Sequence, residues 1–169
     1  MKIFKAIIIL TLSIIVLSAC GQASFEEVSK ETSMSVKEAL NEKAKDANKE
    51  SEGINFYLPF GYEVEDASPN NIILKNGSKT YILFNNPQEN DTSDVVYKAT
   101  AAQYEELDVK EQIKLDDKFG FLIIKHLDED MNEMTIGVGG TKITTLVKTS
   151  SMNNEAKAMS QIVTSVKVN

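Results

Sequence analysis

Hydrophobic and polar residues divide the chain into three stretches. An apolar run, Ala6 to Leu17, is followed by a polar stretch and then by short apolar runs separated by turn residues. Short apolar runs bounded by glycine, proline and asparagine are typical of β-strands. We therefore expect an N-terminal segment at residues 1–19, a polar segment at 20–52 and a folded domain at 53–169.

The first half of the expected domain is dominated by a hairpin pattern. Ile54 to Leu58 alternates and ends at Pro59, which indicates a strand. Two further apolar runs, Asn71 to Lys75 and Thr80 to Phe84, are joined across Asn76-Gly77. Asn-Gly is a strong hairpin signal because both residues tolerate positive φ. The sequence therefore predicts an antiparallel hairpin with a type I′ turn.

The second half contains a long apolar run and another hairpin. Phe119 to His126 is almost continuously apolar, which is typical of a strand covered on both faces. Met134 to Val138 and Lys142 to Val147 predict a hairpin across Gly139-Gly140. Consecutive hairpins exclude a parallel βαβ arrangement, so we expect an antiparallel sheet.

Helical periodicity is clearest at the C-terminus. After a plausible N-cap at Asn153, apolar residues recur at helical spacing: Ala156, Met159, Val163 and Val166. Val95 to Leu107 fits a short helix, although Val-Val-Tyr also favours a strand. We predict the α+β class: an antiparallel β-sheet built from hairpins, packed by one or two helices that include a C-terminal amphipathic helix.

The polar segment before the domain predicts a spacer and a helix. We expect residues 21–34 to be a flexible spacer and residues 35–50 to be a helix, with Ser35 and Glu38 as a capping box. Gly53 stands where a helix C-terminal cap belongs. The apolar stripe of this helix is mostly alanine and buries little area, so it fits a stalk that docks weakly. A partner-binding helix is the alternative.

The N-terminal segment has the organisation of a secretion signal. Lys2 and Lys5 precede the apolar run of 12 residues, which is short of the roughly 20 needed to span a bilayer. The following residues, Leu17-Ser18-Ala19-Cys20, resemble the bacterial lipobox, whose pattern is aliphatic, small, small, cysteine. An uncleaved transmembrane helix with an incidental cysteine is the alternative.

The lipobox resemblance implies a cellular location and a lipid anchor. It implies cleavage after Ala19 and a diacylglyceryl group, with palmitate-type chains, on Cys20. Two acyl chains hold a protein stably on a membrane, since each buried CH₂ contributes about 0.8 kcal/mol. We therefore expect a lipoprotein on the extracytoplasmic face of the cell membrane. Cys20 is the only cysteine, so no disulfide forms within the chain.

Charge and composition narrow the range of partners. The formal charge is −7, and removal of Lys2 and Lys5 with the signal makes it −9. An acidic chain repels the phosphodiester backbone, so we expect no nucleic acid partner. All 18 basic residues are lysine. No guanidinium fork is therefore present to bind phosphate or carboxylate in bidentate fashion.

The folded part resembles the PsbP-like fold family. The matching features are the opening segment Phe56 to Tyr62, the Asn-Gly hairpin, and the final hairpin followed by Ala156 to Val166. Family members usually carry tryptophan where this chain has Tyr62. The resemblance implies an antiparallel sheet between helices and a non-catalytic binding or assembly role, often beside membranes. It implies no active-site residues.

Catalytic and metal motifs are incomplete. His126 is the only histidine, so a zinc site lacks further His or Cys ligands once Cys20 is acylated. No Gly-x-Ser-x-Gly sequence is present to supply a nucleophile for a triad. We expect His126 at a strand end near the surface, and we assign no catalytic residue, no metal ligand and no cofactor.

Acidic and glycine-rich segments offer weaker candidates. Asp128 to Glu133 matches the first half of an EF-hand loop, but Glu133 replaces the turn glycine and Gly139 the bidentate glutamate. A solvated hairpin loop is expected there, with a looser calcium site left open. Gly137 to Gly140 fits a tight turn, because no helix follows to bind phosphate. The remaining paired acids, Glu105-Glu106 and Asp116-Asp117, look solvated.

Three functions remain in competition. The leading hypothesis is a non-enzymatic, membrane-anchored module that binds or scaffolds an envelope protein that the sequence does not identify. The alternative is a small cell-envelope hydrolase that uses acidic residues, which requires a carboxylate of raised pKa in a cleft. A solute-binding lipoprotein is disfavoured, because such clefts lie between two lobes and this chain builds one domain.

Overall fold

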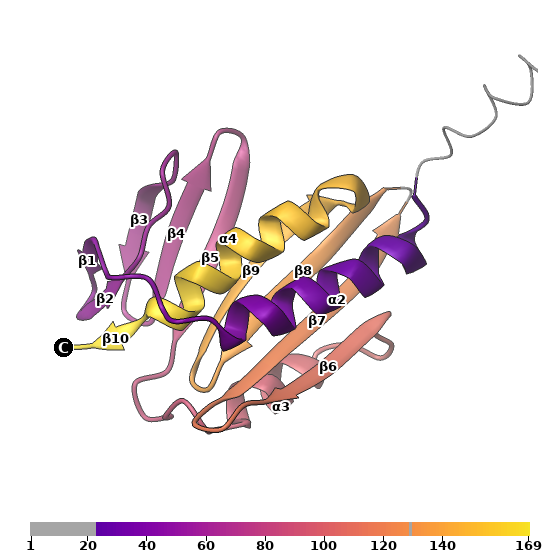
Figure 1. Ribbon diagram of the computed structural model, residues 1–169. Coiled ribbons are helices and arrows are strands. Elements are labelled where there is room, and N and C mark those ends of the chain that lie inside the picture. Colours follow the sequence, from indigo (N-terminus) through magenta and orange to yellow (C-terminus); the bar gives the residue numbers. More distant parts are fainter. Residues whose placement is uncertain (1–22, 129) are drawn as a thin grey trace, which may run out of the picture.

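Strand pairing in the computed structural model organises the chain around one large antiparallel sheet (Figure 1). The structure describes residues 23–128 and 130–169. Seven strands pair antiparallel in the order β3-β4-β5-β9-β8-β7-β6. Their bounds are β3 (Glu63–Ser68), β4 (Asn71–Asn76), β5 (Lys79–Asn85), β6 (Val109–Lys114), β7 (Phe119–Asp128), β8 (Met131–Val138) and β9 (Thr141–Lys148).

A second, three-stranded sheet and the helices complete the architecture. The small sheet has the order β1-β2-β10, with β1 at Lys49–Ser51, β2 at Ile54–Phe56 and β10 at Lys167–Val168. The helices are α2 (Phe25–Asn41), α3 (Val95–Ala101) and α4 (Met152–Ser165), which follows a 3-10 turn, η1 (Thr149–Ser151). Antiparallel sheets with separate helices make this an α+β fold, as the hairpin pattern predicts.

Helices α2 and α4 lie side by side across one face of the seven-stranded sheet (Figure 1). The main hydrophobic core fills the layer between them and the sheet. Leu40 of α2 packs directly on Gly120 of β7, where an added Cβ would lie 2.6 Å from the Leu40 Cδ1 atom. The side chains that are fully buried in this layer include Val36, Leu40, Leu122, Ile124, Met134, Ile136, Met159 and Ile162.

The short helix α3 covers only part of the other face. It packs Val96, Tyr97 and Ala101 against β7, whose contribution is Phe119, Phe121 and Ile123. Strand β7 is therefore covered on both faces, and the prediction from its continuous apolar run is confirmed. The predicted helix at Val95–Leu107 is also present, although it ends at Ala101.

Both predicted hairpins form, but the predicted type I′ turn is wrong. Asn76 still pairs with Lys79 inside the ladder, so the turn residues are Gly77 and Ser78. Only Gly77 has positive φ, at +60°, which is the requirement of a type II′ turn. Gly139 takes the same first position in the β8–β9 turn, with φ +53°.

The N-terminal helix differs from its prediction in position and in packing. It begins at Phe25, inside the predicted spacer, and its capping box is Ser24 with Glu27. It ends at Asn41, and Lys49 and Glu50, at the end of the predicted helix, belong to β1 (Lys49–Ser51). Gly53, predicted as a helix cap, instead closes the β1–β2 turn with φ +76°.

Small polar residues explain why the docking face of α2 was missed. Along with Val28, Val36 and Leu40, the helix buries Ser29, Thr32 and Ser33. A hydroxyl-bearing side chain counts as polar in a hydrophobic pattern, yet its small volume lets two helices approach closely. Asn153 was also misassigned as a cap, since Ser151 precedes α4 and Asn153 lies within its first turn.

We expect α2 to stabilise the domain as a core element. The Leu40→Ala substitution removes a fully buried side chain and should lower the free energy of unfolding by about 2–5 kcal/mol. Met34→Ala on the same helix is the control, because Met34 is 53% exposed and should change it by about 0.5 kcal/mol or less. Urea unfolding of the mature chain measures both. Equal effects would show that α2 is not part of the cooperative unit.

Candidate binding groove

The half of the sheet that α3 leaves open forms a groove. Its floor is the outward face of β5, β9 and β8, with Asn71 of β4 at one edge. On β5 and β9, side chains that face the groove alternate with those that enter the core. On β5, Tyr81 and Leu83 are buried, whereas Ile82 between them is 47% exposed. On β9, Leu146 is 53% exposed between two buried neighbours. Large apolar side chains at such exposure favour a surface that contacts another molecule.

Two hollows, of about 510 and 620 Å³, make up this groove. They share Ile82, Glu133 and Thr144, so they adjoin over the middle of the open face. The register aligns their floor in rows: Phe84 lies opposite Lys142, Ile82 opposite Thr144, and Glu133 opposite Leu146. The first hollow is bounded on one side by α3, through Val95, Val96, Ala99 and Thr100.

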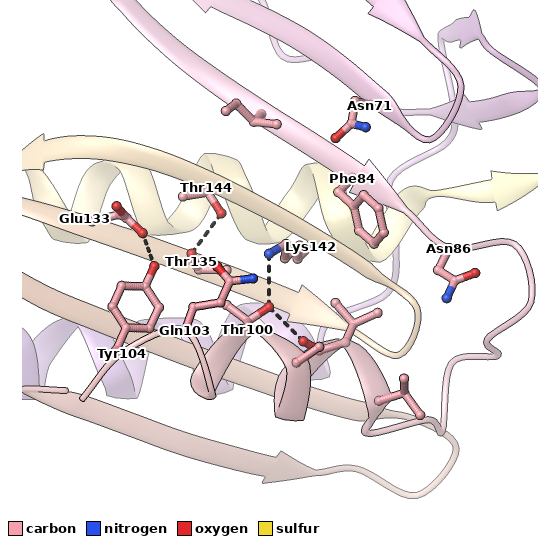
Figure 2. A pocket seen from close by; sticks show the side chains of 14 residues that line it. Asn71, Phe84, Asn86, Thr100, Gln103, Tyr104, Glu133, Thr135, Lys142 and Thr144 are labelled. Carbon is pink, nitrogen blue, oxygen red and sulfur yellow. Dashed lines mark hydrogen bonds between the residues drawn. The ribbon is translucent and has the colours of Figure 1, made fainter. Parts of the chain in front are cut away.

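Lys142 is the cation of the first hollow. Its Nζ donates to the Thr100 Oγ1 atom at 3.0 Å and lies 5.9 Å from the centroid of the Phe84 ring (Figure 2). The Thr100 hydroxyl in turn donates to the Val96 carbonyl at 2.7 Å, so it accepts from the lysine with its lone pairs. Burial lowers the pKa of Lys142, and the charge of Glu133 only partly opposes this effect.

The opposite wall of the first hollow holds a tyrosine–carboxylate pair. Figure 2 shows the Tyr104 hydroxyl directed at the Glu133 carboxylate, to which it donates a hydrogen bond. Burial raises the pKa of Tyr104 to about 12, and the bond to Glu133 acts in the same direction. At neutral pH the tyrosine is therefore a neutral hydrogen-bond donor to the Glu133 carboxylate.

The buried carboxylate of the described residues lies on the other face. Glu155 of α4 accepts hydrogen bonds from Lys79 and from the Tyr81 hydroxyl, the latter at 2.6 Å. The Tyr62 hydroxyl lies 3.3 Å from the Glu155 carboxylate and from the Tyr81 hydroxyl. Desolvation raises the pKa of Glu155, but the hydrogen bonds from Lys79 and Tyr81 outweigh it, so the pKa is lowered. Burial raises the pKa of Tyr81, and the hydrogen bond to Glu155 acts in the same direction.

This network joins α4 to the strands beneath it. A carboxylate of lowered pKa is the opposite of what a general acid requires, since such an acid must keep its proton near neutral pH. Glu155 instead accepts hydrogen bonds from Lys79 and Tyr81 of β5, and it does not line either hollow. We interpret Glu155 as a structural tie between α4 and the sheet.

His126 lies near the start of α2 rather than in the groove. Its Nδ1 atom is 2.8 Å from the Asn132 Oδ1 atom, and its ring centroid is 4.9 Å from that of Phe25. The prediction of a strand-end, partly exposed His126 is confirmed. In residues 23–128 and 130–169, no group of three or more His, Cys, Asp or Glu side chains could hold a metal ion.

The other predicted candidates are scattered. Asp128 and Met131 pair at the β7–β8 turn, and Glu129 between them lies outside the described residues. The lipobox residues Leu17, Ser18, Ala19 and Cys20 also lie outside them. Gly137 to Gly140 forms the end of β8 and its turn, as predicted. An added Cβ on Gly137 would lie 2.2 Å from the Phe121 ring, so glycine is needed there.

Sequence reasoning missed both Lys142 and Glu155. A signal was available for each: Lys142 shares the two-residue period of Thr144 and Leu146, which marks one face of a strand. Glu155 adjoins the apolar stripe of α4, at helical spacing from Met152 and Met159. A charged residue on a buried stripe predicts a partner, although not which partner.

Comparison with known proteins does not identify a family for this chain. No protein-family model matches the chain, and no curated protein is significantly similar to it. Within the described part of the chain, none of the helices is both long and apolar enough to cross a membrane.

We expect the Glu155→Gln substitution to change the acid dependence of stability. At neutral pH the loss of charge-assisted hydrogen bonds should lower the free energy of unfolding by about 1–3 kcal/mol. Because the folded-state pKa of Glu155 is lowered, its contribution is complete above the unfolded value of about 4.3 and is lost as pH falls below it. Denaturant unfolding between pH 7 and pH 3 should show the two proteins converging.

Glu31→Gln, at an exposed position on α2, is the matched control for that experiment. It should follow the wild type across the whole pH range to within about 0.5 kcal/mol. A constant difference between wild type and the Glu155→Gln variant from pH 7 to pH 3 would contradict the assigned role of the carboxylate.

Proposed function

We propose that this protein is a lipid-anchored lipoprotein on the extracytoplasmic face of the cell membrane, and that it binds another envelope component without catalysing a reaction. The observation that carries the proposal is the half-open face of the seven-stranded sheet. A groove there combines exposed Ile82 and Leu146 with the half-buried ammonium of Lys142. An apolar floor with a few polar groups that fix orientation is the usual composition of a binding site.

The anchor part of the proposal rests on the N-terminal sequence. Two lysines, a 12-residue apolar run and Leu17-Ser18-Ala19-Cys20 together resemble a lipoprotein signal. The same resemblance supports a membrane partner through the lipid on Cys20 and an envelope component as the ligand. The acidic charge of the mature chain supports the absence of nucleic acid partners.

The family proposal is that the domain has a PsbP-like fold. It is supported by the order of elements: an opening strand, the β4–β5 hairpin, the β8–β9 hairpin and then α4. Helices on both faces of an antiparallel sheet agree with that family's architecture. The hydrolase alternative has less support, because the groove contains the single carboxylate of Glu133, which is bonded to Tyr104.

The anchor is tested by the Cys20→Ala substitution in the producing cell. Without a thiol to take the diacylglyceryl group, the precursor should keep its signal, incorporate no labelled palmitate and migrate at its full 169-residue length. Metabolic labelling and gel migration measure both effects. Incorporation of labelled palmitate into the variant would show that Cys20 is not the lipidation site.

The groove is tested by photo-crosslinking in intact cells. A benzophenone side chain in place of Ile82 should form one reproducible adduct that mass spectrometry identifies as an envelope component, because this position is 47% exposed inside the groove. The same group in place of Met34, at 53% exposure on α2, is the control and should not form that adduct. An adduct from position 34 with none from position 82 would place the binding surface on the helical face instead.

A further inference from the structure

The groove runs lengthwise along β9. Lys142, Thr144, Leu146 and Lys148 alternate with core residues and therefore point to the open face. Six residue steps separate Lys142 from Lys148, which at about 3.4 Å per residue is roughly 20 Å. The lining of the groove therefore extends along about 20 Å of β9, a length that an extended chain can follow.

One end of the groove lies at the start of α2. Met131 and Lys148 line that end and are paired with each other in the register of β8 and β9. The neighbouring residue Asn132 contacts His126, whose ring packs against Phe25, the first residue of α2. Figure 1 shows the start of α2 at the same end of the sheet as the β7–β8 turn and the start of α4, the helix that follows β9.

Chain length fixes how far this end can be from the membrane. Phe25 comes five residues after Cys20, so a lipid on Cys20 holds the start of α2 within about 18 Å of its own attachment point, even with a fully extended backbone. The groove end at Lys148 and Met131 is therefore on the membrane side of the domain. The end at Lys142 points away from the bilayer.

The far end of the groove is built for an anion. The Lys142 ammonium has three N–H donors, and the structure gives it one hydrogen bond, to Thr100. Among the described residues, no carboxylate oxygen lies within 4 Å of its Nζ atom. An oxygen anion beside the Lys142 ammonium would complete its hydrogen bonding, while Phe84 and Ile82 would contact an apolar tail.

We propose that the groove holds a membrane lipid with an anionic headgroup, its anion at Lys142 and one acyl chain along β9 toward the bilayer. This inference rests on the proposed anchor and on the groove as the binding site, and it names the class of ligand. The apolar floor at Ile82 and Leu146 supplies the contact for the acyl chain. The membrane-side opening gives the lipid a short path from the bilayer to the groove.

The test uses the mature chain with Cys20→Ser, in which any introduced cysteine is the only thiol. Leu146→Cys places an environment-sensitive fluorophore in the groove, and Met34→Cys places it on α2 as the control. Oleate is the anionic probe, monoolein carries the same chain with a neutral head, and acetate supplies the anion alone. Oleate should shift the emission of the groove label saturably and leave the α2 label unchanged.

Lysine variants identify where the anion lies. Lys142→Met should weaken oleate binding roughly tenfold, the loss expected for one charge-assisted hydrogen bond, and should leave monoolein unaffected. Lys142→Arg should restore oleate binding. Lys148→Met, at the other end of the same strand face, tests the opposite orientation of the lipid and should weaken oleate binding far less than Lys142→Met. Lys37→Met, at an exposed position on α2, is the control and should leave oleate binding unchanged. Unfolding curves of each variant separate loss of binding from loss of fold.

Four results would overturn the inference. The first is that oleate and monoolein bind the wild type equally well, and the second is that acetate competes as well as oleate does. The third is that oleate binding depends on Lys148 instead of Lys142. The fourth is that oleate shifts the emission of the labels at positions 146 and 34 equally. If oleate fails to bind while position 82 still crosslinks one identified envelope protein, the groove is a protein-binding site and only the lipid assignment is wrong. If both fail, the proposed function fails with it.

Discussion

Helices cover the two faces of the seven-stranded sheet unequally, and this difference determines where the core and the groove lie. One face is fully occupied by α2 and α4, and the core between them accounts for the apolar residues of β5, β7, β8 and β9 that point inward. The seven residues of α3 cover the other face only near β7. What remains open over β5 and β9 is the groove, because none of the helices in the described residues covers that part of the sheet.

The packing of α2 changes the geometry expected for the anchored protein. A helix that fills the core at Val36 and Leu40 is part of the domain rather than a stalk beneath it. Because α2 begins at Phe25, little chain separates it from Cys20, and the domain is expected close to the bilayer. In the proposed lipid-anchored form, the β7–β8 turn and the end of β9 would face the membrane, because both lie near the start of α2.

The strand pattern could be predicted because local rules decide it. Asn76-Gly77 and Gly139-Gly140 identify two hairpins, and the apolar run at Phe119 identifies a strand covered on both faces. The turn type was wrong because the register, set by pairing of Asn76 with Lys79, moved the turn by one residue. Helix α2 was misplaced because its buried face includes Ser29 and Thr32, whose hydroxyls make them count as polar in a hydrophobic pattern.

The groove itself could not be predicted, since it depends on which strands become neighbours. Phe84 and Lys142 are far apart in the chain and meet only through the pairing of β5 with β9. Thr100 reaches Lys142 only because α3 ends above that pair. Periodicity marks the outward face of each strand, but the crossover connection that places β9 beside β5 is a property of the whole fold.

The central claim is that the open face is where this protein binds its ligand. The most direct measurement is a crystal structure of the lipidated protein purified from its own membrane without exchange of bound molecules. The account predicts elongated density over β5 and β9, with an anionic end within hydrogen-bond distance of the Lys142 Nζ atom. An empty groove together with density bound elsewhere, on α2 or at the Glu155 network, would contradict it.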